Sequence, residues 1–165
     1  MSVQPIIEEL KKTRALHQSL LTTSEAKTEC LKTGDIEQLQ KLLLQERKHV
    51  QAIKQLETKR QKLVGDWAVE HQIPVAETTI SVILKRTSDE PEREALERQF
   101  LALADLLDSL KQQEQLNQQL TEQSLQFIGI SIDMLDPQVQ HMNYGQQAPN
   151  QPQHSSNRSL FDSKA

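Results

Sequence analysis

The sequence has few of the residues on which stapled folds, sheets and compact cores depend, and each shortage excludes something. Cys30 is the single cysteine, so no disulfide can form within the chain. Aromatic residues make up 3% of the chain, and a composition dominated by Gln, Leu, Glu and Lys favours helices over sheets. The hydrophobic fraction of 36% is low for a compact globule, so we expect an elongated helical bundle in which each helix buries one stripe.

Long apolar runs are also missing. The longest apolar patch, from Ile80 to Leu84, contains Ser81 and is too short to cross a bilayer. The first ten residues carry Glu8 and Glu9 and no apolar segment of a signal peptide, so the sequence predicts a cytoplasmic protein without membrane insertion. A net charge of −4 without a basic face argues against a nucleic-acid partner.

Patterns of catalytic or metal-binding residues are lacking as well. Glu46 and His49 have the Glu-x-x-His spacing of di-iron bundles, but the companion motif on a second helix is missing. The four glycines are isolated, which excludes a phosphate-binding loop, and no glycine-rich turn accompanies Cys30 as a nucleophile. We therefore expect no catalytic residues, no metal and no cofactor.

What the sequence does contain is a series of helices separated by clear breaks, predicted over 5–32, 36–70, 80–86 and 92–135. Gly34 can close the first helix and Asp35 can cap the second, so this short connection makes them antiparallel neighbours. After residue 136 the composition shifts to Gln, Asn, Pro and Ser, which is typical of disorder. The expected fold is all-α: an elongated antiparallel bundle of three long helices plus one short helix over 1–136, and a flexible polar tail over 137–165.

The apolar stripes of the first two helices contain polar interruptions. The stripe of the first helix is thin between Leu21 and Leu31, and we expect fraying or sliding there. The predicted seam of the second helix includes Ile36, Leu39, Leu43 and Val50 and ends near Trp67. It also contains three charged residues, Glu46, Glu57 and Arg60. Glu57 and Arg60 are three residues apart and can pair. The charged residues either fix the register of the bundle at a cost in stability or lie at the edge of the seam and reach solvent.

The stripe of the last long helix changes character halfway. It is apolar from Leu96 to Leu110, which we assign to the bundle against the second helix, and it then becomes polar. We interpret the late half as a groove for an amphipathic helix of another protein. The alternative is self-association, in which this face makes a homodimer or packs back on the first helix. The candidate client-binding residues all lie in this late half: Leu116, Asn117, Leu120, Thr121, Ser124, Phe127, Ile128, Met134 and Leu135.

The stretch over 39–64, LQKLLLQERKHVQAIKQLETKRQKLV, resembles the core pattern of the FlgN-type flagellar export chaperones. That pattern has leucines, a Lys- and Glu-rich segment and then Leu-Glu-x-x-Arg, here from Leu56 to Arg60. A short helix after a proline break, a long helix with LNQQL over 116–120, and a tail containing Tyr144 and Gly145 match as well. The resemblance covers residues 6–145.

This resemblance implies a cytoplasmic chaperone for hook-associated proteins, which join the flagellar hook to the filament. In that family the late part of the last helix holds the C-terminal helical segment of the client, prevents premature assembly and delivers the client to the type III export apparatus. The resemblance also implies that Tyr144 docks on the export gate. The terminal Leu160 and Phe161 lie outside the family pattern, and a terminus without function is favoured over a docking motif.

Overall fold

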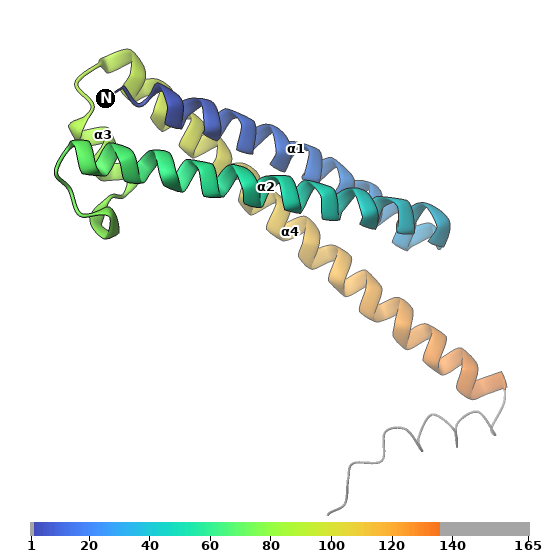
Figure 1. Ribbon diagram of the computed structural model, residues 1–165. Coiled ribbons are helices and arrows are strands. Elements are labelled where there is room, and N and C mark those ends of the chain that lie inside the picture. The colour runs from blue at the N-terminus through green and yellow to red at the C-terminus, as the bar shows by residue number, and fades with distance from the viewer. Residues whose placement is uncertain (1, 136–165) are drawn as a thin grey trace, which may run out of the picture. The chain divides into compact units, whose positions relative to one another are not determined.

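The computed structural model describes residues 2–135, and this part of the chain contains helices and no strand (Figure 1). The elements are α1 (Gln4–Thr33), α2 (Ile36–Glu70), the 3-10 turn η1 (Val75–Glu77), α3 (Ile80–Arg86) and α4 (Glu90–Leu135). The predicted all-α fold is confirmed, and no predicted helix end differs from the observed one by more than two residues. The predicted tail, with Tyr144, Leu160 and Phe161, lies outside the described residues.

The chain divides into two units. Residues 1–124 form a helical bundle, and the second unit begins at Leu125, within α4. The domain boundary predicted after residue 136 falls where the described residues end, so it stays a prediction.

Local capping interactions determine where the helices begin and end. Gly34 ends α1 in the left-handed conformation, with a φ of 75°. The side chain of Asp35 accepts a 3.0 Å hydrogen bond from the backbone N–H of Gln38, which starts α2. Thr79 accepts from the backbone N–H of Val82 at the start of α3, and Asp89 accepts from that of Glu92 at the start of α4.

The hydrophobic core lies at the end of the bundle that contains the N-terminus. All four α-helices contribute to it, since Trp67 of α2, Ile83 of α3 and Leu96 of α4 pack around the first turns of α1. Their partners on the N-terminal stretch of the chain are fully or almost fully buried: Val3, Ile6, Ile7 and Leu10. This cluster fixes the four helices at one end of the bundle.

Helix α1 is the central helix of the bundle. Twelve of its 30 residues are buried, against three of 35 in α2 and four of 46 in α4. Hydrogen bonds join α1 to α4 from Val3 to Glu92 and from Ser24 to Glu114, so the sequence offset stays near 90 along both helices. A constant offset means that α1 and α4 run parallel, with α2 antiparallel to both (Figure 1).

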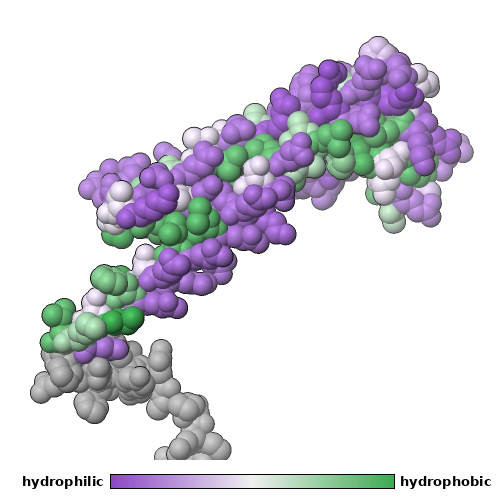
Figure 2. Space-filling view, turned by 180° about the vertical axis from the view of Figure 1, so that it is seen from behind, coloured by the Kyte–Doolittle hydropathy of each residue, from purple (hydrophilic) through white to green (hydrophobic). Residues whose placement is uncertain are grey.

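This arrangement corrects two predictions about the seams. Ile36, Leu43 and Val50, which belong to the expected seam of α2, are exposed. Phe100 and Leu107, in the half of α4 assigned to contacts with α2, are exposed too. The physical reason is that α2 and α4 both pack on α1, and among residues 2–135 no further helix covers these apolar positions. Figure 2 shows apolar surface in strips between hydrophilic side chains on one face of the bundle.

Candidate functional site

The polar stretch of α1 is buried, although it was expected to fray. Thr23, Ser24, Lys27 and Thr28 are all buried, and α1 continues as a regular helix to Thr33. The prediction of fraying between Leu21 and Leu31 is therefore wrong. Ser24, Lys27 and Thr28 have hydrogen-bond partners on other helices, whereas Thr23 donates to the carbonyl oxygen of Ser19 within α1.

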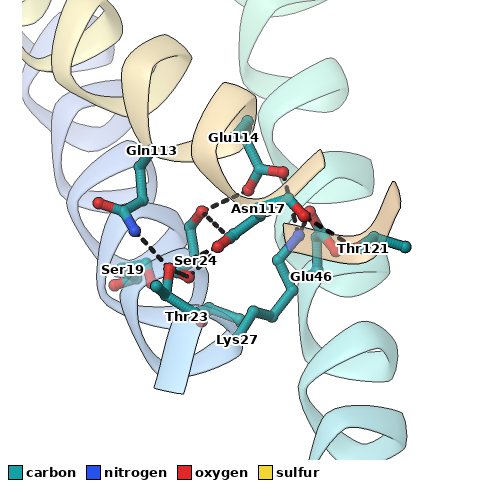
Figure 3. Close-up of polar contacts among 10 residues, drawn as sticks. Ser19, Thr23, Ser24, Lys27, Glu46, Gln113, Glu114, Asn117 and Thr121 are labelled. Atoms are coloured by element: carbon teal, nitrogen blue, oxygen red, sulfur yellow. Dashed lines mark hydrogen bonds and ion pairs between the residues drawn. The ribbon is translucent and has the colours of Figure 1, made fainter. Parts of the chain in front are cut away.

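The main partner of this stretch is Asn117 of α4, which is 4% exposed (Figure 3). Its amide nitrogen donates to the carbonyl oxygen of Ser24 at 2.8 Å and to the Ser24 hydroxyl at 3.1 Å. Its amide oxygen accepts from the hydroxyl of Thr28, and Gln113 donates to the same hydroxyl oxygen. Both ends of the buried amide are thus satisfied, which is the condition for burying such a group at low cost.

Lys27 connects all three long helices within this layer. Its ammonium group donates to Glu46 of α2 at 2.9 Å and to Glu114 of α4 at 3.0 Å (Figure 3). Burial lowers the pKa of Lys27, but the hydrogen bonds to Glu46 and Glu114 and the negative charges of these carboxylates together outweigh burial, so the pKa is raised overall. The cation therefore stays charged, and we call these residues of α1, α2 and α4 the polar layer: Ser24, Lys27, Thr28, Glu46, Gln113, Glu114 and Asn117.

Three hollows lie along α2 and α4, and the third of them is also lined by Ile6 and Leu10 of α1 and by Ile80 and Ile83 of α3. The largest, of about 510 Å³, lies beside the polar layer. Its apolar lining comes from Leu31, Leu39 and Leu43, and α4 contributes residues from Lys111 to Thr121. The second, of about 370 Å³, lies along α2 from Leu43 to Lys54. The third, of about 330 Å³, includes Phe100, Leu103 and Leu107 of α4 and residues from Glu57 to Val64 of α2.

The predicted client-binding residues that belong to the bundle lie in different environments. Asn117 is buried and hydrogen-bonded to α1, so it is not the free contact in an open groove that was expected, and its role in client binding stays a prediction. Thr121 also lines the largest hollow, whereas Leu116 and Leu120 line none of the three. Thr121 and Ser124 donate hydrogen bonds to carbonyl oxygens of their own helix.

Sequence analysis missed the buried Lys27 and the leucine lining of the largest hollow. Leu39 and Leu43 were assigned to a buried seam, and only the packing of α2 shows that this seam lacks a covering helix. One sequence feature pointed to the burial of Lys27: it lies between Leu21 and Leu31, where the stripe of α1 has few apolar residues.

The predicted register residues of α2 are all engaged within the bundle. Arg60 donates two hydrogen bonds to Glu57, at 2.8 and 2.6 Å, as their spacing predicts. These bonds lower the pKa of Glu57 against the opposing effect of burial. Trp67 is buried in the core and stacks on His71 with ring centroids 4.0 Å apart. That these residues and Glu46 fix the register of the bundle stays a prediction.

The second unit begins with the last eleven residues of α4, which are mostly apolar and exposed. Phe127 is 70% exposed and Leu135 is 84% exposed, and Asp133 is the single charged residue between Leu125 and Leu135. The other large apolar side chains with more than half of their surface exposed are Leu125, Ile128, Ile130 and Met134. Such a contiguous set of exposed apolar side chains is typical of an interaction surface.

Residues 2–135 offer neither a metal site nor a membrane-spanning helix. In that range no group of three or more His, Cys, Asp or Glu side chains could hold a metal ion. No helix there combines the length and the apolar character that crossing a bilayer requires.

Comparison with known proteins gives two matches. A family model described as "FlgN protein" matches residues 1–152. An uncharacterized protein of Bacillus subtilis strain 168, YvyG, is 41% identical over 165 residues, which is the full length of both chains. No solved structure matches.

Proposed function

The chain belongs to the FlgN family of flagellar export chaperones, and from this premise we propose that its clients are hook-associated proteins. In this proposal it acts in the cytoplasm, binds the C-terminal helical segment of the client, prevents premature assembly and delivers the client to the type III export apparatus. The family is one of chaperones and not of enzymes.

The observation that carries the proposal is the exposed apolar end of α4. Phe127, Met134 and Leu135 expose large apolar surfaces to water. Burying such surface against a partner stabilises the complex by about 25 cal/mol per Å². A helical client segment with its own apolar stripe can cover such a surface by helix-to-helix packing. We propose Leu116, Leu120, Thr121, Ser124, Phe127, Ile128, Met134 and Leu135 as the client contacts, and Tyr144 as the contact to the export gate.

Aspartate substitutions in the late part of α4 test this proposal. Phe127→Asp and Leu120→Asp place a charge in the client interface, so we expect binding to purified hook-associated proteins to weaken at least tenfold. Gln126→Asp is the matched control, because it adds the same charge to the same helix beside Phe127 at a polar, exposed position. Binding is measured by titration calorimetry, and helix content is checked by circular dichroism.

A second candidate, self-association, uses the same exposed side chains. Light scattering of the purified chain with and without client separates the two. A monomer that forms a one-to-one complex supports the chaperone. A stable dimer that is lost in Phe127→Asp, with client binding unaffected by either aspartate, would favour the structural protein.

A further inference from the structure

We propose that the uncovered sides of α2 and α4 form a second docking surface, which takes an amphipathic helix with acidic flanks. This surface, the α2–α4 groove, comprises Leu39, Leu43, Val50 and Val64 on α2 and Phe100 and Leu107 on α4. It is distinct from the exposed end of α4, because all of its residues lie in the bundle unit. The inference rests on the proposed function, since the helix that docks here belongs to the client.

The positions of the lining residues on α2 support one continuous surface. On α2 the three hollows take up successive parts of a single face, from Leu39 to Leu43, from Leu43 to Lys54 and from Glu57 to Val64. Residues spaced by three or four lie on the same side of a helix. The stretch from Leu39 to Val64 is about 38 Å long at 1.5 Å per residue, which matches a partner helix of about 25 residues.

Among residues 2–135 no fourth long helix packs between α2 and α4, which is why these apolar residues are exposed. On each helix the apolar residues follow the helical period of a buried stripe: Leu43 and Val50 on α2, and Phe100 and Leu107 on α4. All four side chains are nevertheless exposed in the bundle. A helix laid between α2 and α4 would cover these four side chains and complete a four-helix bundle around the same apolar stripes.

The charges beside the groove determine which kind of helix fits. The acidic residues that line it in the middle, Glu46 and Glu114, are both paired with the buried Lys27. Besides Lys27, three cations line the same hollows, Arg47, Lys54 and Lys111, and none of these three has an ion-pair partner among residues 2–135. A partner helix with Asp or Glu beside its apolar stripe pairs with these cations.

A second copy of this chain fits the groove less well than such a partner. In a two-fold dimer the same surface meets itself, so the unpaired Arg47, Lys54 and Lys111 of one chain would meet those of the other. Like charges at an interface oppose association. The charges therefore favour a different, acidic partner.

The test is binding of purified hook-associated proteins to the full chain with charges reversed beside the groove. We expect the triple variant Arg47→Glu, Lys54→Glu, Lys111→Glu to bind at least tenfold more weakly. The control, Lys48→Glu with Lys62→Glu, reverses cations at exposed positions of α2 that line none of the three hollows, and we expect less than a twofold change. Binding of the unsubstituted chain should also weaken as salt is raised from 50 to 500 mM, by about tenfold or more, because salt screens exposed charges.

Leu43→Asp provides a second variant that does not depend on the cations. Leu43 is exposed, so the bundle tolerates the change, and we expect at least tenfold weaker binding with an unchanged circular dichroism spectrum. Unchanged binding in both Leu43→Asp and the triple variant overturns the groove, while the proposed function stands if Phe127→Asp still weakens binding. Absence of any binding by the unsubstituted chain overturns the proposed function, and this inference falls with it.

Discussion

At the scale of single residues, Asn117 shows how a polar position becomes part of a helix interface. A buried amide is costly when unpaired, but every hydrogen-bonding group of this side chain faces a partner on α1. The same holds for Lys27, whose charge is balanced by two carboxylates from two different helices. We therefore expect the polar layer to specify which residues of α1 and α4 lie side by side more strictly than a purely apolar interface would.

Asn117→Ala should destabilise the bundle. The substitution leaves the buried carbonyl of Ser24 and the hydroxyl of Thr28 without these bonds, so we expect a loss of about 1–3 kcal/mol in the free energy of unfolding. The control is Gln119→Ala, at an exposed position two residues along α4, for which a change below about 0.5 kcal/mol is expected. Urea denaturation measures both, and equal effects of the two substitutions would contradict the role of the amide.

At the scale of the helices, chain reversal between α1 and α2 depends on one glycine. Gly34 has a φ of 75°, a conformation that side chains with a Cβ atom disfavour. Gly65 lies inside α2 with a helical backbone, and a Cβ atom there would meet nothing within 4 Å. The two glycines thus have opposite consequences for stability.

Replacing each glycine by alanine should therefore change stability in opposite directions. Gly34→Ala forces a Cβ atom into the left-handed region, so we expect a loss of about 1 kcal/mol. Gly65→Ala removes a residue of poor helix propensity, so we expect a gain of up to about 1 kcal/mol. Thermal and urea denaturation of the two variants give the signs directly. A stabilised Gly34→Ala would mean that the turn adopts another conformation.

At the scale of the whole molecule, the bundle and the end of α4 are separate units with different surfaces. The hydrophobic core and the polar layer lie entirely before residue 118, and the mostly apolar, exposed stretch begins at Leu125. Shortening the chain can therefore remove the proposed client contacts of the second unit without affecting the stability of the bundle.

A chain that ends at Ser124 should fold with nearly the stability of the full chain. Because it retains the core and the polar layer, we expect its free energy of unfolding to change by less than about 0.5 kcal/mol. A chain that ends at Leu110 lacks Gln113, Glu114 and Asn117, so we expect a loss of more than about 1 kcal/mol. Urea denaturation compares the two, and a large loss on truncation at Ser124 would show that the bundle depends on later residues.

The sequence by itself determined the helices, because their ends depend on groups a few residues apart. Gly34, Asp35, Thr79 and Asp89 act through hydrogen bonds or backbone conformations that are local in the chain, so the helix bounds could be predicted closely. The pair of Glu57 and Arg60 was predictable for the same reason, since it lies within one turn of α2.

Only the tertiary structure decided which stripe each helix buries. The polar layer joins Ser24 and Thr28 to Asn117 across about 90 residues of sequence, and no local pattern reveals such a pairing. The exposure of Leu43, Val50 and Leu107 likewise follows from the central position of α1, since no further helix in the part of the chain that the structure describes covers these side chains. Helical periodicity shows that a face is apolar, but the arrangement of the helices determines what covers it.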